Sequence, residues 1–239
     1  LTVIKNWDNK TWLSSQNYIK AFNKFLLKNI NLDSNSKILD VGCGRGKILG
    51  NLSSILKLKN KPLGIDIVNH KDKDKRINFK KIDALSFISK NKIKFDFVLI
   101  KQTIHLLKLK EIKFLLTQLK KNLNPRGKIF ILNLNPHRNE IPSFELMKIK
   151  LSESMVRDKK ILNYIMKVFP KSMLKNFSFK VRISKKKYID MISNRYISTL
   201  LNFNKKQIIN GIDEINSKYK KNINFDDKLV CIIIKNDLN

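Results

Sequence analysis

The sequence predicts an α/β fold built on an open, doubly wound and mostly parallel sheet of seven strands. Short apolar runs alternate with helical patterns along the chain, as the strands and helices of such a sheet do. The first run leads into a glycine-rich loop that opens a helix. The chain has 239 residues with 42% hydrophobic content, which is enough for one full core. We therefore expect a single domain over residues 1–239.

The segment 37–46, Lys-Ile-Leu-Asp-Val-Gly-Cys-Gly-Arg-Gly, carries the strongest signal. Its apolar residues predict a buried strand, and a helical pattern begins directly after it. Three glycines stand at alternate positions between the two: Gly42, Gly44 and Gly46. Glycine lets the backbone approach a ligand, and the free N–H groups of a helix's first turn favour an anionic group. The loop therefore predicts a nucleotide-like cofactor.

The glycine spacing narrows the choice of cofactor. The dinucleotide fingerprint G-x-G-x-x-G needs glycine at its sixth position, where this chain has Lys47. Asp40, directly before the loop, suits a ligand that carries an amino group better than a pyrophosphate. At these residues the chain resembles the class I S-adenosylmethionine (SAM)-dependent methyltransferases. Their first motif, a strand ending in Asp or Glu and then G-x-G-x-G, matches residues 40–46 without a gap.

The resemblance covers about residues 35–135 and implies the rest of a cofactor site. A second strand is expected at 62–67, where the family's acid, here Asp66, accepts both ribose hydroxyls. A third strand, at about 77–82, ends at Asp83, which the resemblance places against the adenine amino group. The alternative for Asp83 is a helix cap or turn residue.

Two further strands complete this core. A fourth is expected at 95–100 and a fifth at 128–132, with a helix at about 109–123 between them. We interpret Cys43 as a packing residue, because no base adjoins it. The resemblance implies SAM as the cofactor and S-adenosylhomocysteine as the product. The complete predicted cofactor site is Asp40, Gly42, Cys43, Gly44, Gly46, Asp66, Ile67, Asp83, Ala84, Lys101 and Gln102.

His105 is the candidate catalytic residue. In the family, the loop after the fourth strand opens beside the transferable methyl group. A histidine there could remove a proton from an attacking hydroxyl, amine or thiol, or it could only pack against cofactor or substrate. The three histidines, His70, His105 and His137, lack the spacing of metal ligands, so we predict no metal site.

The remaining segments are expected to build the acceptor site. Residues 11–30 have apolar positions at helical spacing, which predicts an amphipathic helix within an N-terminal cap over 1–34. Trp7, Trp12 and Tyr18 are candidates for lining the acceptor pocket, although aromatic residues at this spacing are also typical of a core. We assign Phe22 and Phe25 to the core.

A helical lid is expected at 137–176, after the SAM-binding core at 35–135. Its helical patterns lie near 144–157 and 159–169, and closing it would exclude water from the transfer.

The C-terminal part, 177–239, predicts two more strands and two more helices. The strands are expected at 177–183 and 228–235, and the helices near 185–193 and 205–219. Residues 194–200 and 227–231 resemble the end of small-molecule methyltransferases related to the trans-aconitate type. Arg195 is a candidate for binding a substrate carboxylate, with helix capping or a surface bridge as the alternatives.

The net charge of +31 suggests a polyanionic partner, but the residue types argue against it. Only seven of the 50 basic residues are Arg, the side chain best suited to phosphates and base edges. Lys is dispersed, and we interpret its excess, with that of Asn and Ile, as a coding bias. We expect the basic runs at 71–76 and 184–187 to be solvated faces and predict no specific nucleic-acid partner.

The sequence also indicates a cellular compartment. Two cysteines offer no disulfide framework, and the chain has no signal-peptide pattern and no apolar stretch near 18 residues. We therefore expect a cytoplasmic protein without a membrane span.

The predicted function is methyl transfer from SAM to a small molecule by in-line displacement. The acceptor atom can be O, N, S or C. The alternatives are an RNA or protein methyltransferase, a non-catalytic SAM-binding partner subunit and a nucleotide-dependent oxidoreductase. The sequence leaves the oligomeric state open.

Overall fold

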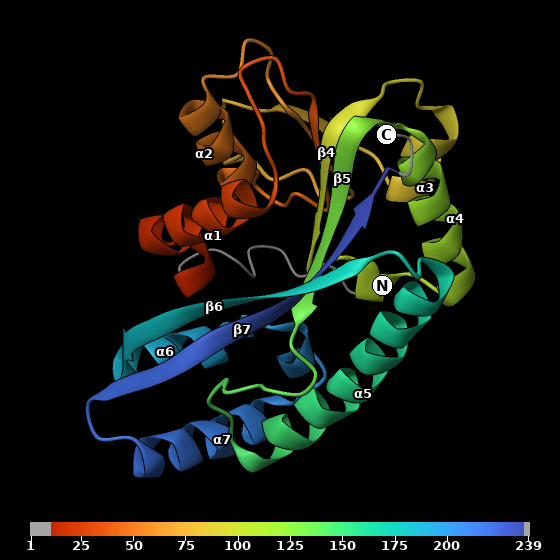
Figure 1. Cartoon of the computed structure of the whole chain (residues 1–239). Helices are drawn as coiled ribbons and strands as arrows, with labels where there is room; N and C mark the ends of the chain where they lie inside the picture. The colour runs from red at the N-terminus through yellow and green to blue at the C-terminus, as the bar shows by residue number, and fades with distance from the viewer. Residues whose placement is uncertain (1–10, 237–239) are drawn as a thin grey trace.

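A computed structural model describes residues 11–236 of the chain (Figure 1). Within these residues seven strands form one sheet, in the order β3-β2-β1-β4-β5-β7-β6. The strands are β1 (Ile38–Val41), β2 (Leu63–Asp66), β3 (Asn78–Lys81), β4 (Phe95–Lys101), β5 (Leu123–Leu134), β6 (Met173–Ser184) and β7 (Asn222–Lys235). Strands β1 to β5 pair in parallel, whereas β7 pairs antiparallel with both β5 and β6. The predicted doubly wound, mostly parallel sheet is confirmed.

Helices cover both faces of the sheet. They are α1 (Gln16–Asn29), α2 (Lys47–Leu56), α3 (Ala84–Lys90), α4 (Leu109–Lys121), α5 (Glu145–Val168), α6 (Lys185–Ser193) and α7 (Lys205–Lys218), with 3-10 turns η1 (Trp12–Ser14), η2 (Ile104–Leu106) and η3 (Ser198–Leu200). Helix α1, the expected amphipathic segment, begins where the Ser15 side chain accepts the N–H of Tyr18. In Figure 1, α1 and α2 lie on one side of β4 and β5, and α3 and α4 lie on the other.

The two helical layers enclose two apolar clusters, one on each face of the sheet. Along β4, Phe97 and Leu99 belong to the cluster on the α1 and α2 side, and Val98 and Ile100 to the cluster on the α3 and α4 side. Successive side chains of a strand point to opposite faces. A strand covered on both faces is therefore apolar at most positions, with Asp40 in β1 and Asp96 in β4 among the exceptions, and this is why β1 and β4 were readable from the sequence.

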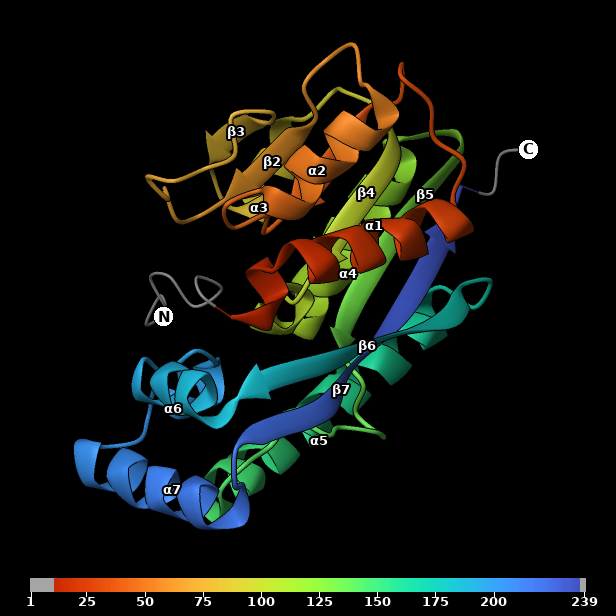
Figure 2. The same cartoon turned by 90° about the vertical axis from the view of Figure 1, so that its left-hand side faces the viewer.

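The sheet continues beyond its parallel part as a two-stranded extension. Strand β5 ends at Leu134, which pairs with Leu229, and only β6 and β7 pair beyond that point. We call residues 178–184 and 222–228 the β-arm. It leaves the carboxyl edge of the parallel strands, and α6, α7 and the first half of α5 lie along it (Figures 1 and 2).

The predicted bounds of β6 and β7 were too short. The structure begins these strands at Met173 and Asn222, ahead of the expected 177 and 228. Residues 174–176 of β6 are exposed, and in β7 buried Ile223 and Phe225 alternate with polar residues that are not buried. An apolar run therefore never forms there, and the strand signal is weak.

The prediction of two helices at 144–157 and 159–169 was wrong. A single helix, α5, spans 24 residues without interruption. Its charged middle interrupts the apolar spacing but contains no Gly or Pro that would break a helix. Residues early in α5 belong to the apolar cluster on the α1 side, and Ile161 and Ile165 belong to the opposite one. Among the described residues, no helix is both long and apolar enough to span a bilayer.

Candidate active site

The carboxyl ends of β1, β2 and β4 meet at one edge of the sheet. Asp40 on β1 pairs in register with Gly64 on β2 and Leu99 on β4. Asp66 ends β2, and Lys101 ends β4. The predicted acids Asp40 and Asp66 are thereby brought together beside the glycine loop. In an open α/β sheet, ligands bind at this edge.

The glycine loop has a backbone that only glycine adopts without strain. Gly42, Gly44 and Gly46 all have positive φ, at 74°, 54° and 69°. A Cβ atom on Gly42 would lie 2.1 Å from Oγ1 of Thr103, in the segment that follows β4. The loop and the 102–105 segment are therefore in direct contact, with no room for a side chain between them.

The carboxylate of Asp66 faces the glycine loop. It accepts hydrogen bonds of 2.8 Å from the backbone N–H of Gly44 and 2.8 Å from that of Val68. A carboxylate has about four lone-pair sites, so about two remain for further donors. The positive φ values of the glycine loop would strain any other residue. This backbone and the remaining acceptor sites of Asp66 fit the ribose diol that the resemblance implies at Asp66.

Burial controls the protonation of the groups behind the loop. Asp40 is 4% exposed. Desolvation raises its pKa to about 7, opposed by the charge of Lys101 and reinforced by that of Asp66. Burial, followed by the charges of Asp40 and Asp66, also raises the pKa of Cys43. The Cys43 sulfur would lie 2.7 Å from a Cβ on Gly64, so this thiol is neutral and packs against β2.

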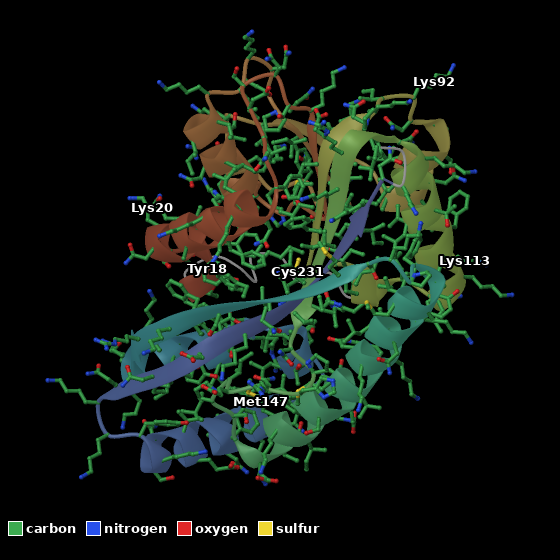
Figure 3. All side chains as sticks on the ribbon, viewed as in Figure 1. Tyr18, Lys20, Lys92, Lys113, Met147 and Cys231 are labelled. Carbon is green, nitrogen blue, oxygen red and sulfur yellow. The ribbon has the colours of Figure 1, made fainter. Side chains whose placement is uncertain are left out.

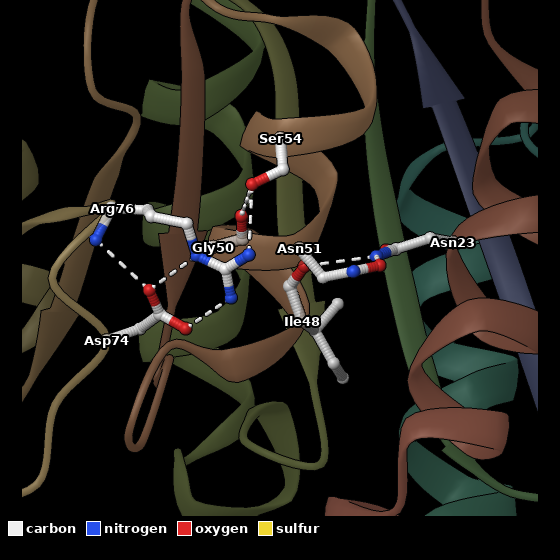
Figure 4. Close-up of polar contacts among 7 residues, drawn as sticks. All are labelled: Asn23, Ile48, Gly50, Asn51, Ser54, Asp74 and Arg76. Atoms are coloured by element: carbon white, nitrogen blue, oxygen red, sulfur yellow. Dashed lines mark hydrogen bonds and ion pairs between the residues drawn. The ribbon is translucent and has the colours of Figure 1, made fainter.

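From the sequence we expected the charged segment 71–76 to be a solvated face. The structure shows that two of its acids also make specific contacts. The buried Arg45 of the glycine loop forms a 2.7 Å ion pair with Asp72. Asp74 is buried and pairs with Arg76 at 2.7 Å, and a Cβ on Gly50 of α2 would lie 2.4 Å from its Cγ (Figure 4). These contacts fix the segment to the glycine loop and to α2.

Helix α1 is also fixed to α2 by a buried amide. The Asn23 side chain donates to the Ile48 carbonyl at 3.1 Å and to Oδ1 of Asn51 at 2.8 Å (Figure 4). The N-terminal segment is thereby held against the helix that the glycine loop opens.

Asp83 has the capping role that the sequence offered as its alternative. Its side chain accepts the N–H of Ser86 at 2.8 Å and so caps α3, which begins at Ala84. Hydrogen bonds from Ser86 lower the pKa of Asp83. Its second oxygen leaves the adenine role open, and contacts of the cofactor with Asp83, Ala84, Ile67 and Gln102 stay predictions.

A buried polar contact connects the N-terminal segment to the β-arm. The indole N–H of Trp12 donates to Oδ2 of Asp227 at 3.0 Å. The Trp12 ring packs edge-on against Tyr196 and Phe225, at centroid distances of 5.4 and 5.0 Å. Asp227 is 1% exposed, and burial raises its pKa, while Trp12, Lys101 and Tyr18 oppose the rise. The sequence reasoning missed Asp227. Asp227 follows Ile223 and Phe225 at the inward-facing positions of β7. This alternation can be recognised in the sequence only if the strand is begun at 222.

Tyr18 and Lys101 lie between the Trp12–Asp227 contact and the cofactor edge. The Lys101 ammonium lies 5.4 Å from the centroid of the Tyr18 ring and 5.6 Å from that of Phe22. Its charge acts on both Asp40 and Asp227. Phe22 is fully buried in the core and Phe25 packs against it, as predicted.

The other two predicted acceptor-site residues have different outcomes. Arg195 has a positive φ of 51°, and its guanidinium donates to the carbonyl of Leu200. That contact is the local structural role that the sequence allowed, and substrate binding by Arg195 stays a prediction. Trp7 lies outside the described residues.

His105 lies in η2, two residues after the Thr103 that contacts Gly42. The pKa of His105 is lowered, mainly by burial. The charge of Asp158 and a hydrogen bond with the Asn133 side chain oppose this shift, and the charge of Arg157 adds to it. The imidazole is therefore neutral near pH 7, the state that a general base requires.

An open groove of about 600 Å³ lies on the β-arm, and one of its lining residues, Phe225, also packs against Trp12. Lys180 and Arg182 line it together with Glu140 and Asp226, so its walls carry both signs of charge. Within residues 11–236, no three His, Cys, Asp or Glu side chains are grouped as metal ligands would be.

Comparison with known proteins decides the family. A family model described as a methyltransferase domain matches residues 13–182, more than half of the chain. The chain belongs to this methyltransferase family. The predicted enzyme class, a SAM-dependent methyltransferase, is confirmed, and SAM is the cofactor of that class. Among curated proteins, none matches the sequence.

Solved structures share the fold at low sequence identity. The plantazolicin methyltransferase BpumL, in complex with a pentazolic desmethylPZN analog and S-adenosylhomocysteine, is 20% identical, with a TM-score of 0.52 over 97% of this chain and 88% of that one. A putative methyltransferase from an antibiotic biosynthesis pathway of Anabaena variabilis ATCC 29413 is 13% identical, with a TM-score of 0.62 over 89% and 96%. The [4+2]-cyclase SpnF is 13% identical, with a TM-score of 0.55 over 100% and 88%. The same fold therefore supports different reactions, and the acceptor has to be argued from the site.

Proposed function

We propose that this methyltransferase transfers the methyl group of SAM to a small-molecule acceptor. The observation that supports a small acceptor best is the buried contact of Trp12 with Asp227. It joins the N-terminal segment to the β-arm, and we infer that Trp12 and Tyr18, both buried in the core, form one wall beside the cofactor edge. An enclosed, mostly apolar site with a few polar groups is typical of small-molecule binding.

The cofactor edge has a carboxylate acceptor for two parts of SAM that the resemblance assigns. Asp66 accepts the ribose hydroxyls, and Asp40 faces the amino group. SAM supplies a methyl group bound to a positively charged sulfur. The glycine loop keeps side chains out of the space between backbone and ligand. Holding the acceptor in line with the methyl group can contribute about 7–11 kcal/mol to lowering the barrier.

His105 is the proposed proton acceptor. As the acceptor's O, N or S atom forms its bond to the methyl carbon, the bond from that carbon to sulfur breaks, and the acceptor's proton passes to the neutral imidazole. A carbon acceptor would lose its proton to the same group. Trp12 and Tyr18 are buried in the core, and we propose that this packing keeps water from their side of the cofactor edge.

The RNA and protein alternatives have less support. Lys20, Lys92 and Lys113 point outward from distant parts of the molecule, which argues against one basic stripe (Figure 3). The β-arm groove carries acids beside its two basic residues. Both cysteines are free, and we propose a cytoplasmic location on that basis. The trans-aconitate subgroup remains a proposal that rests on 194–200 and 227–231.

The first experiment is calorimetric titration of SAM and S-adenosylhomocysteine into the purified chain at moderate salt, with NADH as the control nucleotide. We expect micromolar binding of SAM or its product and no binding of NADH. Release of S-adenosylhomocysteine is then measured with panels of small acids, amines and thiols, and in parallel with RNA and protein.

Each outcome of these experiments favours one of the proposed functions. Turnover with a small molecule supports the proposal. Turnover only with RNA or protein replaces it with the second alternative. Absence of SAM binding favours a non-catalytic partner subunit whose glycine loop is vestigial, and binding of NADH would favour the oxidoreductase.

A further inference from the structure

Three polar side chains from separate elements meet on the α5 side of the sheet. His105 comes from η2, Asn133 from the end of β5 and Asp158 from the middle of α5. Asn133 is 8% exposed and Asp158 is 7% exposed. Only His105 is recognisable from the sequence, because Asn133 and Asp158 lie 28 and 53 positions away from it and belong to no motif.

Two atoms in this group lack a well-placed hydrogen-bond partner among residues 11–236. They are Nδ1 of His105 and Oδ1 of Asn133, and both are buried. The Asn133 side chain is nevertheless near enough to the imidazole to act on its pKa by hydrogen bonding. If Nδ1 carries the proton, a small rotation lets it donate to Oδ1 of Asn133, and both atoms are satisfied.

Asp158 adds a negative charge behind the pair. It and Asn133 line one small cavity of about 10 Å³ between α5 and the sheet. The other cavity walls are mainly apolar, including Ile161 and Ile165. The charged groups that act on His105 are Asp158 and the adjacent Arg157, which pair with each other at 3.0 Å. Asp158 is buried, whereas the Arg157 side chain is 51% exposed.

We propose that Asn133 and Asp158 are positioning residues for His105, fixing its Nδ1–H tautomer so that Nε2 is left to take the acceptor's proton. Asn133 accepts from Nδ1–H, and Asp158 stabilises the imidazolium that forms when Nε2 is protonated. The inference rests on the proposed function, in which His105 is the base. It makes α5 part of the catalytic machinery, since this helix supplies the charge behind the base.

The tautomer can be measured without any substrate. The chain has three histidines, so the His105 ring signals in a long-range ¹H–¹⁵N NMR spectrum are identified by their loss in His105→Gln. At a pH where the ring is neutral, we expect the unmodified protein to have Nδ1 protonated and Nε2 unprotonated. The Nε2–H form in the folded, unmodified protein would overturn the proposal.

Variants then separate the two positioning roles. Asn133→Leu should shift the ring toward the Nε2–H tautomer. Asp158→Asn should lower the pKa of His105, and Asp158→Glu should restore it. Glu153→Gln, on the exposed face of α5, is the matched control and should change neither property. A His105 pKa that is unchanged in folded Asp158→Asn would exclude the charge role.

Kinetics connect the geometry to turnover once an acceptor is known. Asn133→Leu and Asp158→Asn should lower kcat by about ten- to a hundredfold with little change in KM, because a misplaced base costs up to about a hundredfold. If NMR gives the expected tautomer but His105→Ala keeps full turnover, the pairing stands and the base role fails. If SAM does not bind, the proposed function fails while the NMR result remains valid.

Discussion

The cofactor edge and the acceptor side of this molecule are built in different ways. At the cofactor edge, the glycine loop and the ends of β1 and β2 lie within about 30 residues of one another along the chain, and Asp66 bonds to Gly44 only 22 positions away. On the acceptor side, Trp12 bonds to Asp227 across 215 positions. A site made from neighbouring segments leaves a motif in the sequence, whereas a site made from distant ones leaves isolated residues. The following substitutions test whether changes on one side leave the property that depends on the other side, such as SAM affinity, unchanged.

Asp40→Asn should have the largest effect, and it acts on the cofactor edge. The folded-state pKa of Asp40, about 7, is above the unfolded value, so the folded state binds this proton more tightly. The stability gained from that proton is complete below about pH 4 and is lost as the pH rises through 7. Asn cannot ionise, so at pH 8 the variant should be more stable than the parent by up to about 4 kcal/mol, at about 1.4 kcal/mol per pKa unit.

Guanidinium unfolding from pH 4 to pH 8 measures this difference. The variant should approach the parent's stability at pH 4, and it should bind SAM more weakly above about pH 7, where the parent's Asp40 is ionised. Asp213→Asn, an exposed acid on α7, is the control and should leave the pH dependence as it was. Equal stability of Asp40→Asn and parent at pH 8 would contradict the assignment of a raised pKa to this group.

His105→Ala should lower turnover by at least about a hundredfold, the usual contribution of a general base, while SAM affinity changes little. Because burial lowers the pKa of His105, the parent's rate should rise with pH, with a midpoint below that of an ordinary histidine. Initial rates across pH, combined with calorimetry, test both points. Turnover within about threefold of the parent would remove His105 from the chemistry.

Asp66→Ala should weaken SAM binding by about ten- to a hundredfold, since charge-assisted hydrogen bonds are worth about 1.5–3 kcal/mol. The fold should persist, which circular dichroism checks. Asp83→Ala is the informative comparison, because one oxygen of Asp83 already caps α3. Unchanged affinity in Asp66→Ala would refute the ribose assignment.

Trp12→Phe should have the smallest effect and should fall on the acceptor side. It keeps an aromatic ring in the core but leaves buried Asp227 without its indole donor, at a cost of about 1.5 kcal/mol. Unfolding in denaturant measures the loss, and SAM affinity should stay near that of the parent. In an Asp227→Asn background the same substitution should cost less. An equal cost in both backgrounds would mean that the two side chains are not coupled.

The sequence by itself determined the parallel half of the sheet and the cofactor motif. The strands β1, β2 and β4 are short apolar runs covered on both faces, and their ends carry Asp40, the glycines and Asp66 in a fixed order. Each of these signals is local, because a strand end, a tight loop and a helix start follow one another along the chain.

Only the tertiary structure decided how the acceptor side is assembled. It made α5 one helix, began β6 earlier, lengthened β7 into the β-arm, and placed Asn133 and Asp158 beside His105. It also showed that Trp12 bonds to Asp227 and that the segment 71–76 is fixed by Arg45. Apart from Arg45, which lies within the glycine motif, none of these residues belongs to a motif, because what brings them together is the burial of apolar surface between elements far apart in the sequence. Burial depends on the whole fold and leaves no local pattern for an isolated polar residue.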